Sequence, residues 1–123
     1  MKIYKTKLFH RWAIGEGVDD ASLRAAVREM TQGLADALGG YVFKKRIPLP
    51  GRGKRGGART LIAYKQGNVA IFMYGFSKNE QANIDTNELK ALRLLAKQLL
   101  NFNETDLVKA VNAGELREVD GHG

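Results

Sequence analysis

The chain has 123 residues, of which 44% are hydrophobic and 27% charged, as in an ordinary globular domain. It contains no cysteine, which excludes thiol nucleophiles, disulfides, zinc ribbons and iron–sulfur clusters. The formal net charge is +7, and the only histidines are His10 and His122. His10 falls in a helical stretch and His122 in the final segment, so we expect any catalysis to use other residue types.

The first forty residues predict a strand followed by two helices. Residues 2–6 alternate as a strand does, and residues 9–13 form a short helical face. Asp19 or Asp20 can cap a second helix that we expect to continue to about Leu38, where two glycines stop it. The apolar face of this helix consists of Leu23, Ala26, Val27, Met30, Leu34 and Ala37.

The middle of the chain predicts three strands. Residues 41–47 are rich in strand formers and are followed by two prolines. Residues 51–57 predict a loop of glycines and cations, and residues 58–65 a second strand. A hairpin turn then leads into residues 69–76, which are almost entirely apolar and therefore predict a central strand.

The last third predicts two helices and a short strand. A long helix is expected over residues 86–100, and Asn103 or Thr105 can cap a shorter one. Residues 115–119 can add a final strand. Consecutive strands with short connections predict an α+β domain, in which an antiparallel sheet has its helices packed on one face.

The whole chain is expected to form one domain, residues 1–123, with residues 120–123 as a disordered tail. No apolar segment follows the basic N-terminus, so no signal peptide is predicted, and no run approaches the ~18–20 apolar residues of a membrane span. We expect a cytoplasmic protein that does not contact a membrane.

Positive charge is concentrated in residues 41–79, which contain nine Lys or Arg and no Asp or Glu. Since the whole chain is +7, the remainder is close to −2. A local positive field with glycine-rich backbone inside it suits a polyanion such as RNA. The alternative is a basic surface that serves solubility alone.

Residues 51–57, GRGKRGG, match the GxGxxG spacing of dinucleotide-binding loops, but a strand follows where that motif requires a helix. We interpret the segment as a flexible loop whose backbone amides approach phosphates. Its charge comes from Arg52, Lys54 and Arg55. A simple flexible hairpin tip is the alternative.

The neighbouring strands can present cations and aromatic rings to the same ligand. Alternation places Lys44 and Arg46 on one face of their strand and Lys45 on the other. Tyr74 and Phe76 share a face and can stack on bases, or they can belong to the core.

Such a cluster can cleave RNA without histidine or metal. The ribose 2′-OH attacks the adjacent phosphate, a Lys or Tyr takes the proton, and Arg stabilises the charge on the phosphorane. The sequence supplies these residue types without assigning the roles.

The combination of KKR at 44–46, GRGKRGGAR at 51–59 and YGFSKNE at 74–80 resembles the HigB-type branch of the RelE/ParE toxin superfamily. Further similar pieces are NI at 83–84, EL at 88–89 and GELREV at 114–119, so that the resemblance covers nearly the whole chain. It implies the small RelE-like fold and the toxin of a type II toxin–antitoxin module. RelE-like members cut mRNA in the ribosomal A site and leave a cyclic phosphate.

The resemblance also implies site residues, a partner and a reaction. The catalytic cations fall on Lys45 (or its neighbour Lys44), Lys54, Arg59 and Lys78, and Asn83 lies near the place of the family's catalytic tyrosine. The residues expected to bind RNA or the ribosome are Lys44, Arg46, Arg52, Arg55, Tyr74, Phe76 and Asn83.

We therefore expect a metal-independent, cofactor-free endoribonuclease that acts on ribosome-bound mRNA and inhibits translation. Its expected partner is a cognate protein antitoxin, which usually carries a DNA-binding domain. The alternatives are a ParE-like gyrase inhibitor without nuclease activity and a non-catalytic RNA-binding module.

Overall fold

A computed structural model describes residues 1–51, 53–77 and 84–119, and for residues 53–56 it describes the backbone alone. The predicted disordered tail at 120–123 lies outside these residues, as do Lys78 and Asn83.

The chain begins with strand β1 (Lys2–Thr6) and helices α1 (Lys7–Glu16) and α2 (Asp20–Thr31). Of the two predicted caps for α2, Asp19 is the one that accepts a hydrogen bond from the helix. The helix ends seven residues before the predicted Leu38, because Gly33 turns the chain with a positive φ of 86°. Leu34 is consequently exposed, and a short strand, β2 (Asp36–Ala37), replaces the predicted last turns.

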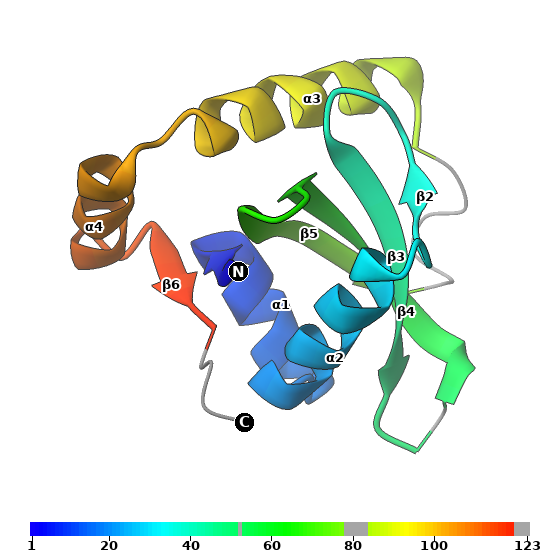
Figure 1. Ribbon diagram of the computed structural model, residues 1–123. Coiled ribbons are helices and arrows are strands. Elements are labelled where there is room, and N and C mark those ends of the chain that lie inside the picture. Colours follow the sequence, from blue (N-terminus) through cyan, green and yellow to red (C-terminus); the bar gives the residue numbers. More distant parts are fainter. Residues whose placement is uncertain (52, 78–83, 120–123) are drawn as a thin grey trace.

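The other strands are β3 (Val42–Leu49), β4 (Gly53–Lys65), β5 (Val69–Ser77) and β6 (Leu116–Glu118). They form one sheet in the order β2-β3-β4-β5-β1-β6 (Figure 1), in which every pair is antiparallel except β1 with β5. The prediction of an α+β fold with a mostly antiparallel sheet is confirmed, and β5 lies inside the sheet as its apolar sequence predicted.

Strand β4 begins earlier than expected. Gly53 pairs with Leu49, so much of the predicted 51–57 loop is backbone of the β3–β4 ladder. The register shifts between Ile47 and Leu49, on either side of Pro48, which has no N–H to give to a ladder. Pairing between β3 and β4 thus continues past Pro48, where the sequence pattern predicted that the strand would end.

Helices cover both faces of the sheet, whereas the sequence predicted one. Ile47 of β3 packs with Phe9 of α1 and Leu23 of α2. Val42 of the same strand packs on the other side with Ala96 of helix α3 (Thr86–Leu100). Figure 1 shows α3 over one face and α1 and α2 over the other, with helix α4 (Glu104–Asn112) beside β6. Consecutive residues along β4, and likewise along β5, point to opposite faces of the sheet and are fully buried, so helices must cover both faces.

Helix α2 is attached to the sheet by two ion pairs, in each of which the lysine is buried and the carboxylate side chain is about 30% exposed. The Lys5 Nζ lies 2.7 Å from Asp20 Oδ1, and the Lys45 Nζ lies 2.6 Å from Glu29 Oε1. Each lysine is only 6% exposed. Removing one partner of such a pair leaves an uncompensated buried charge, so both pairs fix the position of α2.

Gly75 of β5 lies against the indole ring of Trp12 in α1. A Cβ at this position would lie 2.4 Å from a ring carbon of Trp12, and the ring is itself packed on Phe9. We expect Gly75→Ala to lower the free energy of unfolding by about 1–3 kcal/mol through overpacking. Urea denaturation measures this. Gly15→Ala is the matched control, because nothing lies within 4 Å of its Cβ position in α1 and alanine favours helix. Equal midpoints for Gly75→Ala and the parent would contradict the prediction.

Candidate functional site

Two cross-strand rows of side chains carry most of the described candidate residues. Arg46 of β3 is opposite Arg59 of β4, which is opposite Phe76 of β5. In the neighbouring row Lys44, Leu61 and Tyr74 are paired in the same way. Directly paired residues share a face of the sheet, so cations from two strands adjoin the aromatic residues of a third.

An irregularity in β5 gives Tyr74 its place in this row. Leu61 pairs with Tyr74 but Ile62 pairs with Phe72, so Met73 has no partner on β4. Met73 packs with the α3 cluster, and the extra residue brings the next side chain, Tyr74, to the same face. If β5 lacked this extra residue, strict alternation would place the Tyr74 side chain on the face covered by α1.

The rows lie where α3 begins. A cavity of about 280 Å³ is bordered by Leu61 and Tyr74 of the sheet. On the other side it is bordered by Ile84, Glu88, Ala91 and Leu92 of the connection and helix. The α3 residues that are most deeply buried, Ala96 and Leu99, lie farther along the helix. This leaves the Arg46–Arg59 row beyond the part of the face that α3 covers.

Arg46 and Arg59 are like charges directly opposite each other on adjacent strands. Like charges directly opposite each other, with Cβ atoms about 4.5–5.5 Å apart, destabilise a sheet. Neither arginine forms a salt bridge with any described residue, and Arg46 is exposed while Arg59 is half-buried. A bound anion would relieve the repulsion, and two guanidinium groups can contact a phosphate through several charge-assisted hydrogen bonds.

The structure separates the two lysines of β3. Lys44 lies in the candidate rows and is half-buried, whereas Lys45 is on the opposite face in its ion pair with Glu29. Lys45 was predicted as a catalytic residue, but its ammonium is buried beneath α2. Of these two lysines, Lys44, which the family resemblance gave as the other choice, is the one on the candidate face.

The two aromatic residues differ in accessibility. Tyr74 is 37% exposed and Phe76 only 3%, and their ring centroids are 6.0 Å apart. Tyr74 can therefore stack on a base, while Phe76 supports the tyrosine ring from the core.

Thr60 fixes the strands beneath the arginines. Its side chain is fully buried, and its hydroxyl donates a hydrogen bond of 2.9 Å to the backbone oxygen of Lys45. The bond joins β3 and β4 next to the Arg46–Arg59 pair. Neither this hydrogen bond nor the contact of Trp12 with Gly75 was predicted from the sequence. Strand alternation places Thr60 on the face opposite Arg59, but it does not identify a hydrogen-bond partner.

The remaining predicted site residues are not placed by the structure. Lys78 and Asn83 lie outside the described residues, and the side chains of Arg52, Lys54 and Arg55 are also outside them. The backbone of Lys54 and Arg55 belongs to β4, the strand that carries Arg59. The roles of these five residues stay predictions.

His10 lies away from the candidate rows, in α1. Burial lowers the pKa of its imidazole, and the nearby charges of Lys5 and Arg117 lower it further, while Asp20 acts in the opposite direction. Within the described ranges no group of three His, Cys, Asp or Glu residues could hold a metal ion. Among the described residues of the two rows, the polar side chains are those of Lys44, Arg46, Arg59 and Tyr74, and Glu88 of α3 borders the adjoining cavity.

Comparison with known families gives one match over almost the whole chain. The model described as the RelE toxin of the RelE/RelB toxin–antitoxin system matches residues 1–119. No match to a curated protein was found. None of the helices in the described part of the chain has the length and apolar character needed to cross a membrane.

Proposed function

The chain belongs to the RelE family of toxins from toxin–antitoxin systems, and we propose that it inhibits translation as a ribosome-dependent mRNA endonuclease. In this proposal it is a HigB-like member that acts in the cytoplasm without a metal or cofactor. Its cognate antitoxin carries a DNA-binding domain.

The Arg46–Arg59 pair is the observation that supports nuclease activity best. Arg46 and Arg59 are directly opposite each other on the sheet, and neither forms a salt bridge with a described residue, an arrangement that suits a polyanionic ligand. When a phosphodiester reacts through a phosphorane, its non-bridging oxygens gain negative charge. Arginine donors stabilise this phosphorane more strongly than they stabilise the starting phosphate. A ParE-like gyrase inhibitor would not need this arrangement.

The proposed reaction is transesterification within the mRNA. The ribose 2′-oxygen forms a bond to phosphorus, its proton leaves to a basic group, and the 5′-oxygen departs with a proton from an acidic group. Arg59 contacts the non-bridging oxygens, Lys44 the flanking backbone, and the Tyr74 ring a neighbouring base. Lys54 is proposed to bind the backbone or to move a proton, and Lys78 to support the scissile phosphate or the flanking ribosomal RNA. The product is a 2′,3′-cyclic phosphate.

The proposal is tested by inducing the chain in growing cells without its antitoxin. We expect incorporation of labelled amino acids to fall within minutes, while incorporation of labelled thymidine continues. If DNA synthesis stops first and gyrase–DNA complexes accumulate, the ParE-like alternative is correct. If neither rate changes, although the protein is folded and abundant, the toxin proposal fails.

The salt dependence of ribosome binding tests the role of Lys44. If its ammonium contacts a phosphate, Lys44→Gln should reduce the log–log salt slope of affinity by about 0.7–0.9. Lys109→Gln, an exposed lysine on α4, is the control and should leave the slope unchanged. Equal slopes for Lys44→Gln and the parent would remove Lys44 from the interface.

A further inference from the structure

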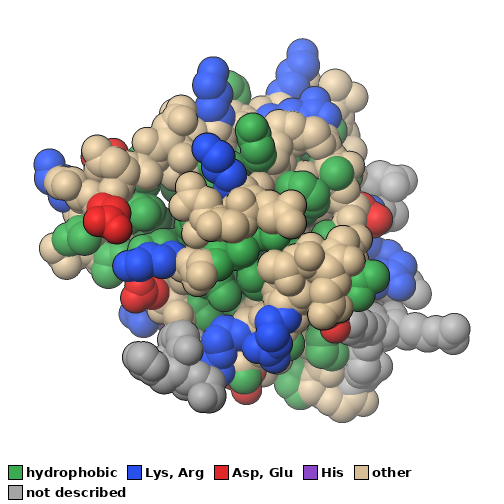
Figure 2. All heavy atoms as spheres, in the orientation of Figure 1, with side chains coloured by type: hydrophobic (Ala, Val, Ile, Leu, Met, Phe, Trp, Pro, Cys, Tyr) green, Lys and Arg blue, Asp and Glu red, His purple; other side chains and the backbone are tan. Residues whose placement is uncertain are grey.

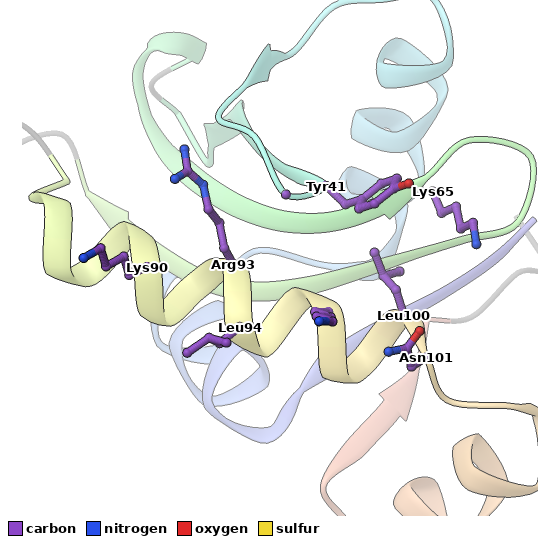
Figure 3. A pocket seen from close by; sticks show the side chains of 9 residues that line it. Tyr41, Lys65, Lys90, Arg93, Leu94, Leu100 and Asn101 are labelled. Carbon is purple, nitrogen blue, oxygen red and sulfur yellow. The ribbon is translucent and has the colours of Figure 1, made fainter.

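A groove of about 670 Å³ runs beside α3, at the end of β4 that is remote from Arg59. Tyr41 and Lys65 border it on the strand side, and Lys90, Arg93 and Leu94 border it on the helix side (Figure 3). Lys65 follows Arg59 by six residues in an extended strand, which separates their backbones by about 20 Å. The groove is therefore distinct from the candidate rows.

Basic side chains surround the groove. It is bordered by Lys65, Lys90, Arg93 and Lys97, and none of the described residues that line it is Asp or Glu. Figure 2 shows Lys and Arg side chains gathered along the upper edge of the molecule, over α3. Within the described ranges, none of the three lysines forms a salt bridge. This edge can accept several carboxylates at once.

Arg93 lines the groove, but its guanidinium is already bound to the backbone. Its Nε and Nη2 both donate hydrogen bonds to the backbone oxygen of Leu38. Its side chain also covers Gly39 and Gly40, where a Cβ would lie within about 3 Å of it. Arg93 thus joins α3 to the turn before β3, and it leaves Lys65, Lys90 and Lys97 as the groups that can contact a ligand.

Two exposed apolar side chains line the groove as well. Tyr41 is 57% exposed and Leu94 65% exposed. Tyr41 has a positive φ of 66°, which is unfavourable for a non-glycine residue, and its backbone oxygen accepts a hydrogen bond from Tyr64 N. The fold thus holds an aromatic ring at the mouth of the groove at some cost in backbone strain. Such rings are frequent anchors in protein interfaces.

We propose that this groove binds an acidic amphipathic segment of the cognate antitoxin, with apolar residues on Tyr41 and Leu94 and carboxylates on Lys65, Lys90 and Lys97. Lys90 and Lys97 are seven residues apart, or about 10 Å along one side of α3, so carboxylates two helical turns apart match them. An RNA backbone would meet the lysines but would leave Leu94 without an apolar partner. The inference rests on the antitoxin part of the proposed function and not on the nuclease chemistry.

Charge reversal in the groove tests the proposal. The variant Lys65→Glu/Lys90→Glu/Lys97→Glu should bind the purified antitoxin about 100-fold more weakly in isothermal titration calorimetry, because like charges would then face each other. The control Lys7→Glu/Arg11→Glu/Arg28→Glu has the same change in net charge on exposed residues of α1 and α2, and its affinity should stay within a few-fold of the parent. Circular dichroism and thermal midpoints establish that both variants are folded.

A second variant separates the apolar contact from the charges. Leu94→Ser should weaken antitoxin binding by about tenfold, since a buried leucine at an interface loses its apolar contact. Unchanged affinity in both groove variants, or an equal loss in the control, would overturn the proposal.

The rate of ribosome-dependent mRNA cleavage by the groove variants without antitoxin tests whether the groove binds the ribosome instead. Rates within about twofold of the parent are expected. Lost cleavage with retained antitoxin affinity would overturn the proposal and make the groove a ribosome-binding surface. If the parent chain itself cleaves no mRNA, the proposed nuclease function fails, while the calorimetry still decides whether the groove binds the antitoxin.

Discussion

Arg59→Ala should reduce the single-turnover rate of mRNA cleavage by about 10²–10³-fold at saturating ribosome, the loss typical of removing one donor to a developing oxyanion. Arg59 lies between Arg46 and Phe76 in its cross-strand row and forms no salt bridge with the described residues. Its removal should therefore relieve repulsion in the free protein, so the fold and antitoxin affinity should be retained. Rapid-quench measurement on programmed ribosomes gives the rate.

Two further variants show whether the guanidinium shape matters. Arg59→Lys keeps the charge but not the planar pair of donors, and we expect it to recover only a small part of the rate. Arg117→Ala, an exposed arginine of β6, is the control and should cleave at the parent rate. A folded Arg59→Ala protein with the parent rate would remove Arg59 from the reaction.

Glu29→Ala should lower the free energy of unfolding by about 2–3 kcal/mol. Breaking a buried ion pair from one side commonly costs 3–5 kcal/mol, and we expect less because the Glu29 side chain is 31% exposed. The Lys45 ammonium would be left buried without this carboxylate. Denaturant unfolding measures the loss.

The double variant Lys45→Met/Glu29→Leu decides between a structural and a catalytic Lys45. Replacing both charges with apolar groups should restore most of the stability that Glu29→Ala loses. If Lys45 is structural, this protein should cleave mRNA at the parent rate. A stable double variant without cleavage would show that Lys45 takes part in the reaction, as the sequence alone predicted.

Most element types were predictable because hydrophobic periodicity and caps are local. The span Thr86–Leu100 of α3 and the cap Asp19 of α2 agree with the prediction. The end of α2 was not predictable from periodicity, since Leu34 and Ala37 continue the helical spacing although neither is buried. Gly33 was the available signal for the end of the helix.

The candidate site was only partly predictable. Strand alternation shows which side chains share a face of the sheet, but it does not show which helix covers that face. It separated Lys44 from Lys45 correctly, but it did not show that α2 would supply Glu29 as the partner of Lys45. The extra residue at Met73, which sets the face of Tyr74, depends on pairing with a second strand. Pairing of Arg46 with Arg59 likewise requires the register of β3 and β4.

Ribosome-dependent cleavage is tested most directly by primer extension on a defined mRNA incubated with purified protein, with and without translating ribosomes. We expect cuts within the codon in the ribosomal A site and a 2′,3′-cyclic phosphate at the new end, with free mRNA left intact. If the folded protein binds the ribosomes and their mRNA stays uncut, the protein binds the ribosome but has no nuclease activity.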